Sequence, residues 1–293
     1  MTAETGARSA LPYGAQSMVA PLDHVLVKRP GPAFAAAFDD PAHGFRHPVA
    51  PTTASHEHDR FVTLLRELGV TVHRLDAESS SPDLIYQFDP SLVTDRGAVL
   101  LRSGKPSRRG EEELQAAWFD AHGIPVIGRI EPPGTVDGGD VCWLGHDEVA
   151  IGRSLRTNQH GIDQLTALLD AQVHVFDVPY DAGEDECLHL LGVISPVTDT
   201  LAVVELARLP SGLYRLLDDR GFTMLAVPPD EVASLACNVL AIRPGVAVVC
   251  EGNPQTIALL EAHGIDVHTF PGTEICWNGS GGPTCLTRPL RRG

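Results

Sequence analysis

The sequence predicts an α/β protein in which five similar units share one hydrophobic core. Runs of Val, Ile and Leu alternate with amphipathic helical stretches, and the alternation recurs roughly every fifty residues, near positions 97, 148, 201 and 246. A unit of one helix and a few strands cannot bury a core alone, so the units are expected to pack with helices outside and strands within. At 293 residues and 43% hydrophobic, the chain can form such a core.

Each unit is expected to contain a strand, an amphipathic helix of about three turns that ends at Gly or a small polar residue, and a second strand. The N-terminal unit fits these elements at 24–30, 58–69 and 70–77. The later units place them at 97–104, 111–123 and 124–131; at 148–154, 160–171 and 173–179; at 201–207, 212–221 and 222–228; and at 246–252, 256–264 and 265–272. Further short strands are expected at 84–88 and 141–144.

A generic α/β protein built of parallel βαβ units is the alternative to this repeat. No GxGxxG follows the first strand, which argues against a dinucleotide-binding fold. No GxxxxGK[ST] occurs, which argues against a phosphate-binding P-loop.

Composition restricts the partners of the chain. A net charge of −16 argues against nucleic acid and anionic membranes and is compatible with a small cationic substrate. No apolar run of 18 residues occurs, so no transmembrane helix is expected. Residues 1–17 are small and polar without the apolar core of a signal peptide. We therefore expect a flexible N-terminal tail over 1–17, one catalytic domain over 18–293 and a cytoplasmic location.

The cysteine and histidine patterns do not indicate a metal or another cofactor. The six cysteines are scattered without CxxC spacing, so neither a zinc ribbon nor a disulfide framework is expected. His56, Glu57 and His58 are too close in sequence for the two histidines to share a helix face, and they are assigned to the surface.

Cys285 is the candidate nucleophile. It follows Gly279, Gly281 and Gly282 on a loop that Pro283 stiffens. A thiolate needs access and nearby positive partial charge, which such a loop can supply. The alternative is a small hydrophobic residue buried beside a glycine-rich turn.

Acidic residues flank two of the expected strands. Asp83 and Asp89 enclose the run 84–88, and Asp137 and Asp140 enclose a glycine pair. Acids at strand ends commonly cap turns. Together with a loop cysteine, they also suggest carboxylates that hold a cation.

His189 and the loop arginines complete the candidate set. A histidine in an apolar run is most often a core residue, but Cys285 requires a proton donor and acceptor that titrates near neutrality. Arg108, Arg109 and Arg156 are ordinary solvated loop residues, or they recognise a carboxylate through the planar guanidinium fork.

These motifs resemble the ordered motif set of the amidinotransferase/dimethylarginine dimethylaminohydrolase family. The matching segments are 23–31, 82–90, 106–111, 133–140, 151–158, 188–192 and 281–285. The resemblance covers nearly the whole chain and implies the pentein fold, an α/β propeller of five ββαβ-type blades around a pseudo-fivefold axis.

The resemblance also implies roles for individual residues. Cys285 would be the nucleophile and His189 the general acid and base. Asp89 and Asp137 would grip a guanidinium, with Asp83 supporting the site. Arg108 and Arg156 would bind the α-carboxylate of the substrate, and Gly282 would line the substrate site. The site residues that the resemblance implies are therefore Cys285, His189, Asp137, Asp89, Asp83, Arg108, Arg156 and Gly282.

Two positions depart from the family pattern. The family usually has Glu where this chain has Asp137, which withdraws the carboxylate by about the length of one methylene. Phe88 stands where bacterial dimethylargininases have an acid beside Asp89. Both differences bear on the substrate more than on the reaction type.

The reaction implied is hydrolysis of an Nω-methylated arginine to citrulline and a methylamine, with no cofactor. An amidinotransferase would share the first half-reaction, and an arginine deiminase is a further option, although this short chain shows no inserted helical domain. A catalytically inactive pentein that acts as a binding protein is the alternative of another class. A homodimer is expected from the abundance of twofold assemblies.

Overall fold

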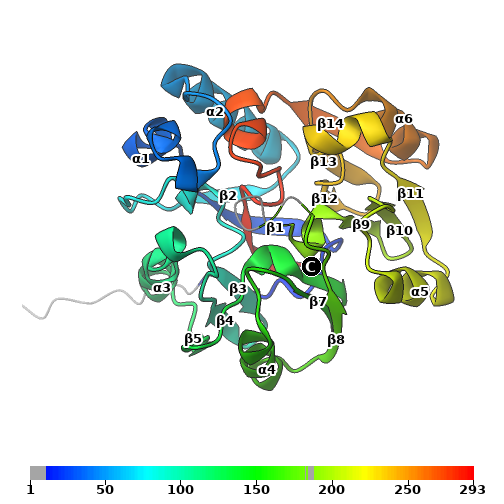
Figure 1. Ribbon diagram of the computed structural model, residues 1–293, viewed down its shortest axis with the longest axis horizontal. Coiled ribbons are helices and arrows are strands. Elements are labelled where there is room, and N and C mark those ends of the chain that lie inside the picture. Colours follow the sequence, from blue (N-terminus) through cyan, green and yellow to red (C-terminus); the bar gives the residue numbers. More distant parts are fainter. Residues whose placement is uncertain (1–10, 182, 184–187) are drawn as a thin grey trace, which may run out of the picture.

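The computed structural model describes residues 11–181, 183 and 188–293. Its strands form five three-stranded sheets, arranged as blades around a common centre with the helices on the periphery (Figure 1). In each blade an antiparallel pair of strands is followed by a helix and by a third strand parallel to the middle one. The five repeating units predicted from the sequence are therefore confirmed.

Four blades follow one another along the chain, each in the order strand, strand, helix, strand. They are β3 (Ser91–Thr94), β4 (Gly97–Leu100), α3 (Glu111–Ala121) and β5 (Val126–Arg129); β6 (Val141–Gly145), β7 (Glu148–Arg153), α4 (Gln159–Leu168) and β8 (Gln172–Asp177); β9 (Ile194–Thr198), β10 (Leu201–Val204), α5 (Ser211–Asp219) and β11 (Thr223–Ala226); and β12 (Leu240–Arg243), β13 (Val246–Cys250), α6 (Pro254–Ala262) and β14 (Asp266–Phe270).

Segments near both ends of the chain form the fifth blade, which closes the ring. Strand β15 (Arg288–Arg292) pairs antiparallel with β1 (Leu22–Val27), and β1 pairs parallel with β2 (Thr71–Arg74). Helix α2 (Pro51–Glu67) joins β1 to β2, after a short helix α1 (Pro32–Ala35).

The flexible tail expected over 1–17 extends too far along the chain, because its last residues are held against the fold. Gly14 donates to the carbonyl of Leu290 and accepts from the amide of Arg292, and 14–16 are buried. Edge pairing with β15 therefore holds this segment against the fold. Residues 1–10 lie outside the described part of the chain.

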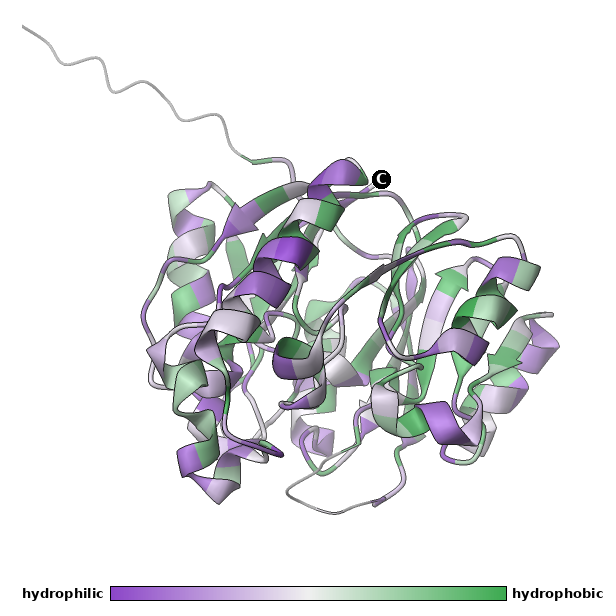
Figure 2. Cartoon of the chain, turned by 90° about the horizontal axis from the view of Figure 1, so that it is seen from above, coloured by the Kyte–Doolittle hydropathy of each residue, from purple (hydrophilic) through white to green (hydrophobic). Residues whose placement is uncertain are grey.

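The core lies between the strands and the inner faces of the helices. Strands β3, β4 and β10 are buried at every residue, whereas β5, at the rim, is exposed at both ends and half-buried in the middle. Hydrophobic residues concentrate on the inner strands and polar residues on the outer helix faces (Figure 2). Continuous Val/Ile/Leu runs therefore form the strands that are covered on both faces.

Two local expectations are wrong. The run 84–88 is not a strand, because 82–85 form a 3₁₀ helix that begins with Pro82 and continues into a backbone turn at Gln87. Proline fixes φ at a helical value and lacks the N–H that a strand would use. The structure also buries Glu57 and His58, which were assigned to the surface, because both lie on the buried face of α2. Glu57 there accepts the backbone N–H groups of Glu274 and Ile275, in a short π-helix over Thr273–Trp277.

Among the residues that the structure describes, no helix is both long and apolar enough to cross a bilayer.

The packing of α4 gives a test of the fold. A Cβ at Gly161 would lie 2.1 Å from the carbonyl oxygen of Thr135, so Gly161→Ala forces the helix away from the neighbouring backbone. We expect the free energy of unfolding to fall by about 1–3 kcal/mol, measured by urea denaturation. Gly31→Ala is the control, because nothing lies within 4 Å of its Cβ position. Equal unfolding midpoints for the two variants would contradict this packing.

Candidate active site

Five segments, one from each blade, lie at the same end of the propeller axis. Each precedes the first strand of its blade: they contain Asp89 before β3, Asp140 before β6, His189 before β9, Asn238 before β12 and Cys285 before β15. The repeat therefore brings one candidate functional side chain from each blade to the same end of the propeller axis.

Hydrogen bonds connect these segments from blade to blade. The Gly139 N–H donates to Asp89 Oδ1 at 2.8 Å, and the Leu190 N–H donates to Asp140 Oδ1 at 2.9 Å. The ring continues through the hydroxyl of Ser195, which donates to the carbonyl of Cys237 at 2.6 Å.

The same ring closes at the cysteine. The Asn238 side-chain amide donates to Cys285 Sγ at 3.3 Å, and the Phe88 N–H donates to the Cys285 carbonyl at 3.1 Å. We call this set of contacts the inter-blade ring.

Cys285 is half-buried at the end of a tightly packed loop. A Cβ at Gly281 would lie 2.3 Å from the ring of Tyr86, and one at Gly282 would lie 2.4 Å from the Asn238 side chain. The glycines thus allow the loop to approach its neighbours closely and fix the position of the thiol. Gly282 contacts Asn238 in this structure, and its expected contact with a substrate stays a prediction.

The thiol is protonated at neutral pH. Burial, with a smaller contribution from the negative charge of Asp89, raises the pKa of Cys285 to about 11. The hydrogen bond from Asn238, the backbone N–H of Gly282 and the charge of Arg108 oppose this rise. A cation bound beside Asp89 would therefore favour the thiolate.

His189 is held against a glycine and beside two carboxylates. Its ring packs on Gly139, where a Cβ would lie 2.8 Å from Nδ1, and its Nε2 lies 3.3 Å from Asp137 Oδ2. Burial by itself lowers the pKa of His189, but the charge of Asp140 and the close contact with Asp137 outweigh burial and raise the pKa to about 10. The imidazole is therefore protonated at neutral pH and can donate a proton.

Asp137 is 1% exposed, and both its carboxylate and its backbone N–H have protein partners. Its Oδ1 accepts the Gly104 N–H at 3.0 Å, and its own N–H donates to Thr157 Oγ1 at 3.1 Å. Burial alone would raise the pKa of Asp137, but the hydrogen bond and charge of His189 outweigh it and lower the pKa to about 2. Asp137 and His189 thus form a buried ion pair.

Arg108 does not lie where the sequence analysis placed it. Its guanidinium is buried and forms ion pairs with Asp89 and with Glu111, the latter at 2.8 Å. It also donates to the carbonyls of Asp83 and Tyr86. These contacts turn Arg108 into the protein, where it supports Asp89 rather than facing a substrate carboxylate.

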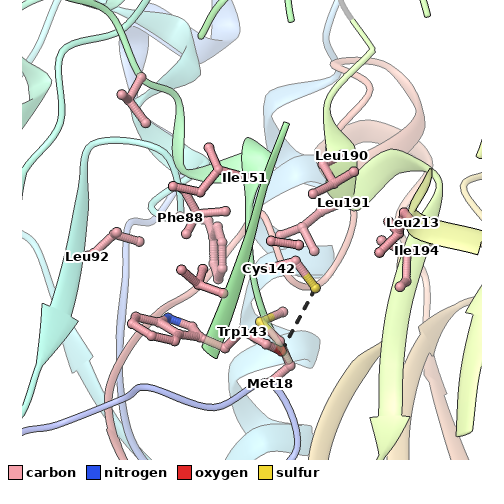
Figure 3. Close-up of a cluster of buried hydrophobic side chains, with 14 of the residues drawn as sticks. Met18, Phe88, Leu92, Cys142, Trp143, Ile151, Leu190, Leu191, Ile194 and Leu213 are labelled. Atoms are coloured by element: carbon pink, nitrogen blue, oxygen red, sulfur yellow. Dashed lines mark hydrogen bonds between the residues drawn. The ribbon is translucent and has the colours of Figure 1, made fainter. Parts of the chain in front are cut away.

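Three other predicted positions have separate surroundings. Asp83 is buried and pairs with Lys105 Nζ at 2.6 Å, which suits a supporting role. Arg156 is half-buried, and its backbone packs against Gly104, the residue that donates to Asp137. Phe88 packs in the core cluster beside Leu92 and Ile151 (Figure 3), and the guanidinium of Arg288 lies over its ring, 4.0 Å from the centroid.

The sequence analysis missed Asn238 and the role of Asp140. Asn238 stands before β12, in the position that Asp89, His189 and Cys285 occupy in other blades, so the repeat itself carried the signal. Asp140 fixes the residue after His189 and also accepts from the Ser154 hydroxyl at 2.6 Å. Both act by holding a chemical group in place.

Within the part of the chain that the structure describes, no cluster of three or more His, Cys, Asp or Glu side chains has the arrangement of a metal site. The groups gathered here can instead act by nucleophilic attack, proton transfer and charge stabilisation of a cation.

Two solved structures share this fold with the chain. The chain superposes on dimethylarginine dimethylaminohydrolase from Pseudomonas aeruginosa, solved with citrulline, with a TM-score of 0.77 and 24% identity over 92% of this chain and all of that one. The N-terminal domain of the cyanobacterial arginine dihydrolase ArgZ gives a TM-score of 0.81 at 18% identity, over 92% of this chain and 98% of the other. These similarities establish the pentein fold.

Sequence comparison agrees. The dimethylarginine dimethylaminohydrolase of P. aeruginosa is 29% identical over 80% of this chain and 87% of its own length. The enzyme of the same name from Streptomyces coelicolor is 28% identical over 92% and 98%. An arginine deiminase from Staphylococcus epidermidis is 25% identical, and the match spans 62% of that longer protein.

The fold and these relatives define a guanidino-group hydrolase of the pentein type. A family model described as N,N dimethylarginine dimethylhydrolase, eukaryotic, matches residues 38–292. The chain belongs to the dimethylarginine dimethylaminohydrolase family.

The raised pKa of Cys285 gives a test of the site. Only the thiolate reacts with iodoacetamide, so the alkylation rate of Cys285 should rise about tenfold per pH unit from pH 7 to 9 and still rise at pH 10. Peptide mass spectrometry measures the rate at this residue, and Cys285→Ser is the blank. A plateau by pH 8 would show a thiol of ordinary or lowered pKa and contradict the arrangement.

Proposed function

We propose that this protein hydrolyses an Nω-methylated arginine to citrulline and a methylamine, through a covalent thiouronium on Cys285. The observation that carries the proposal is the meeting of a thiol, an imidazolium and two carboxylates at one end of the propeller. Four of the five blades supply these groups and the fifth supplies Asn238, which bonds to Cys285, so we infer one catalytic domain over 18–293.

Asp89 and Asp137 would hold the guanidinium. Each carboxylate oxygen has two lone-pair sites, so Asp89 can accept from a substrate while it keeps Arg108 and Gly139. Fixing the planar cation turns its carbon toward the sulfur and converts binding into orientation. Asp137 is shorter than the family's usual Glu, which leaves more room on its side of the cation.

Substrate binding would also activate the nucleophile. In the free protein the pKa of Cys285 is raised by burial and by Asp89, so the thiol keeps its proton. A bound guanidinium offsets the charge of Asp89 and favours loss of that proton to solvent. The enzyme would therefore form a thiolate chiefly when its cationic substrate is present.

The chemical steps then balance. Cys285 Sγ forms a bond to the guanidinium carbon, giving a neutral tetrahedral adduct. Protonated His189 donates its proton to the methylated nitrogen, the C–N bond breaks, and a neutral amine leaves the cationic thiouronium. Neutral His189 next takes a proton from water and the hydroxide adds to the carbon. The C–S bond then breaks while the proton of the added hydroxyl is lost to solvent, which gives citrulline, the thiolate and protonated His189.

Replacement of the nucleophile tests the reaction. Cys285→Ser should lower kcat for dimethylarginine by at least about a thousandfold, because the hydroxyl is a much weaker nucleophile. Citrulline formation is the measurement. Cys142→Ala is the control, since Cys142 is buried in the core and contacts only the carbonyl of Trp143 through its sulfur. Unchanged turnover by Cys285→Ser would refute the proposal.

A substrate panel tests the choice of substrate. We expect monomethylarginine and dimethylarginine to be used in preference to arginine, and agmatine to be poor because it lacks the carboxylate assigned to Arg156. Values of kcat/KM for the four compounds are compared at one pH. Preference for agmatine would remove the carboxylate role of Arg156, and preference for arginine would indicate a deiminase.

Asn238 is expected to position the thiolate. Asn238→Ala removes a hydrogen bond that lowers the pKa of Cys285, so that pKa should rise by about one unit. The rise in pKa should slow alkylation at pH 8 about tenfold. It should also shift the alkaline limb of the kcat/KM profile to higher pH. A uniform loss at every pH, with the limb unmoved, would mean that Asn238 only supports Thr284, whose N–H it also accepts.

A further inference from the structure

A second concave site lies at the opposite end of the propeller. It is a cavity of about 690 Å³, bordered by the hairpin turns of three blades at Asp95, His146 and Asp199 and by the end of β15 at Arg292. Its volume lies within the range of small-molecule sites, about 300–1,000 Å³.

The strands that reach this cavity are those that carry the candidate active site at their other ends. Strand β6 follows Asp140 and ends at Gly145, β9 follows the His189 segment and ends at Thr198, and β15 follows Cys285 and ends at Arg292. The cavity is therefore separate from the active site by the length of the strands.

Arg292 gives this cavity its chemical character. Its guanidinium is buried and donates to the carbonyls of Ala20 at 2.6 Å and Ala241 at 2.9 Å, while its Nε has no hydrogen-bond partner. Among the ion pairs of the described residues, none involves Arg292. A buried cation that meets only carbonyl dipoles lacks the counter-charge that usually accompanies such a group.

The rest of the lining limits which anion can bind. Met18, Val19, Trp143 and Phe222 supply apolar surface, and Met18 and Trp143 are also members of the cluster in Figure 3. Asp95 and Asp199 place carboxylates at the rim, and the second guanidinium of the lining, Arg291, pairs with Asp23 at 3.9 Å. The whole chain carries a net charge of −16. These charges disfavour polyanions such as phosphate but leave room for one negative charge at Arg292.

We propose that this cavity binds a small monocarboxylic acid, with its carboxylate on the guanidinium of Arg292 and its apolar body against Trp143 and Met18. Each terminal nitrogen of Arg292 carries a second N–H besides the one bonded to a carbonyl, and these N–H groups can donate to the oxygens of a carboxylate. The site does not depend on the reaction assigned to Cys285, so the two proposals stand or fall separately.

Benzoate is the probe. Benzylamine is the control compound, because it has a similar shape and the opposite charge. Isothermal titration of the full chain in the presence of saturating citrulline should show one benzoate per chain, and no binding of benzylamine or inorganic phosphate at the same concentrations. Citrulline keeps the probe out of the candidate active site. Failure of benzoate to bind, or equal binding of benzylamine, overturns the proposal.

Two variants locate the bound probe. Arg292→Gln should weaken benzoate binding at least about tenfold, because it removes a charge-assisted pair. The exposed Arg243 lies outside the cavity, so Arg243→Gln is the matched control and should leave binding within about twofold. Unchanged affinity in a folded Arg292→Gln protein overturns the proposal.

A second route covers the case in which Arg292→Gln does not fold. Thr198 lines the cavity at the end of β9 and is half-buried. Among the described residues, no hydrogen bond joins Thr198 to Arg292. Thr198→Phe should occupy the space and also abolish benzoate binding, while citrulline still binds. Retained benzoate affinity in this variant places the probe elsewhere and rejects the site.

Discussion

The inter-blade ring is the constraint on which the site depends. Every group that takes part in the proposed chemistry stands on a segment that is bonded to the next blade, from Asp89 to Gly139, from Asp140 to Leu190, and from Asn238 to Cys285. No blade holds a complete site. The geometry is therefore set by the closure of the five sheets, and closure in turn requires β15 to pair with β1.

Electrostatics explains why such a site suits a cation. Burial keeps the pKa of Cys285 high, and nearby carboxylates hold a proton on His189. The free protein thus has a neutral thiol at Cys285 and a protonated imidazole at His189. Under the proposed function, a guanidinium would supply positive charge at Asp89, so that substrate binding would also activate the thiol.

The sequence was sufficient for the architecture, because strand and helix periodicity indicated the five units. The glycine-rich loop indicated Cys285 as the candidate nucleophile, and that role stays a prediction. The sequence was insufficient for Arg108. The local sequence around a loop arginine is the same whether its side chain lies in solvent or pairs with buried acids such as Asp89 and Glu111. Those acids lie in different segments, and only the folded chain brings them together.

The same limit applies elsewhere. The apolar run 84–88 has strand composition, but Pro82 directs it into a 3₁₀ turn. Asn238 has no motif around it, and its meaning comes from structural equivalence between blades. His58 lies in a polar stretch of sequence, yet α2 turns it inward. In each case a contact distant in sequence decides the role of the residue.

Closure of the propeller has a consequence for how the molecule opens. The amides of Gly139 and Leu190 are bonded across blade boundaries, so neither can be released by fraying within one sheet. Their protection from deuterium exchange should then follow the global opening reaction rather than local fluctuation. In such a protein, partial denaturation does not leave a weakened catalyst, because the first rupture between blades disperses the groups that catalysis needs.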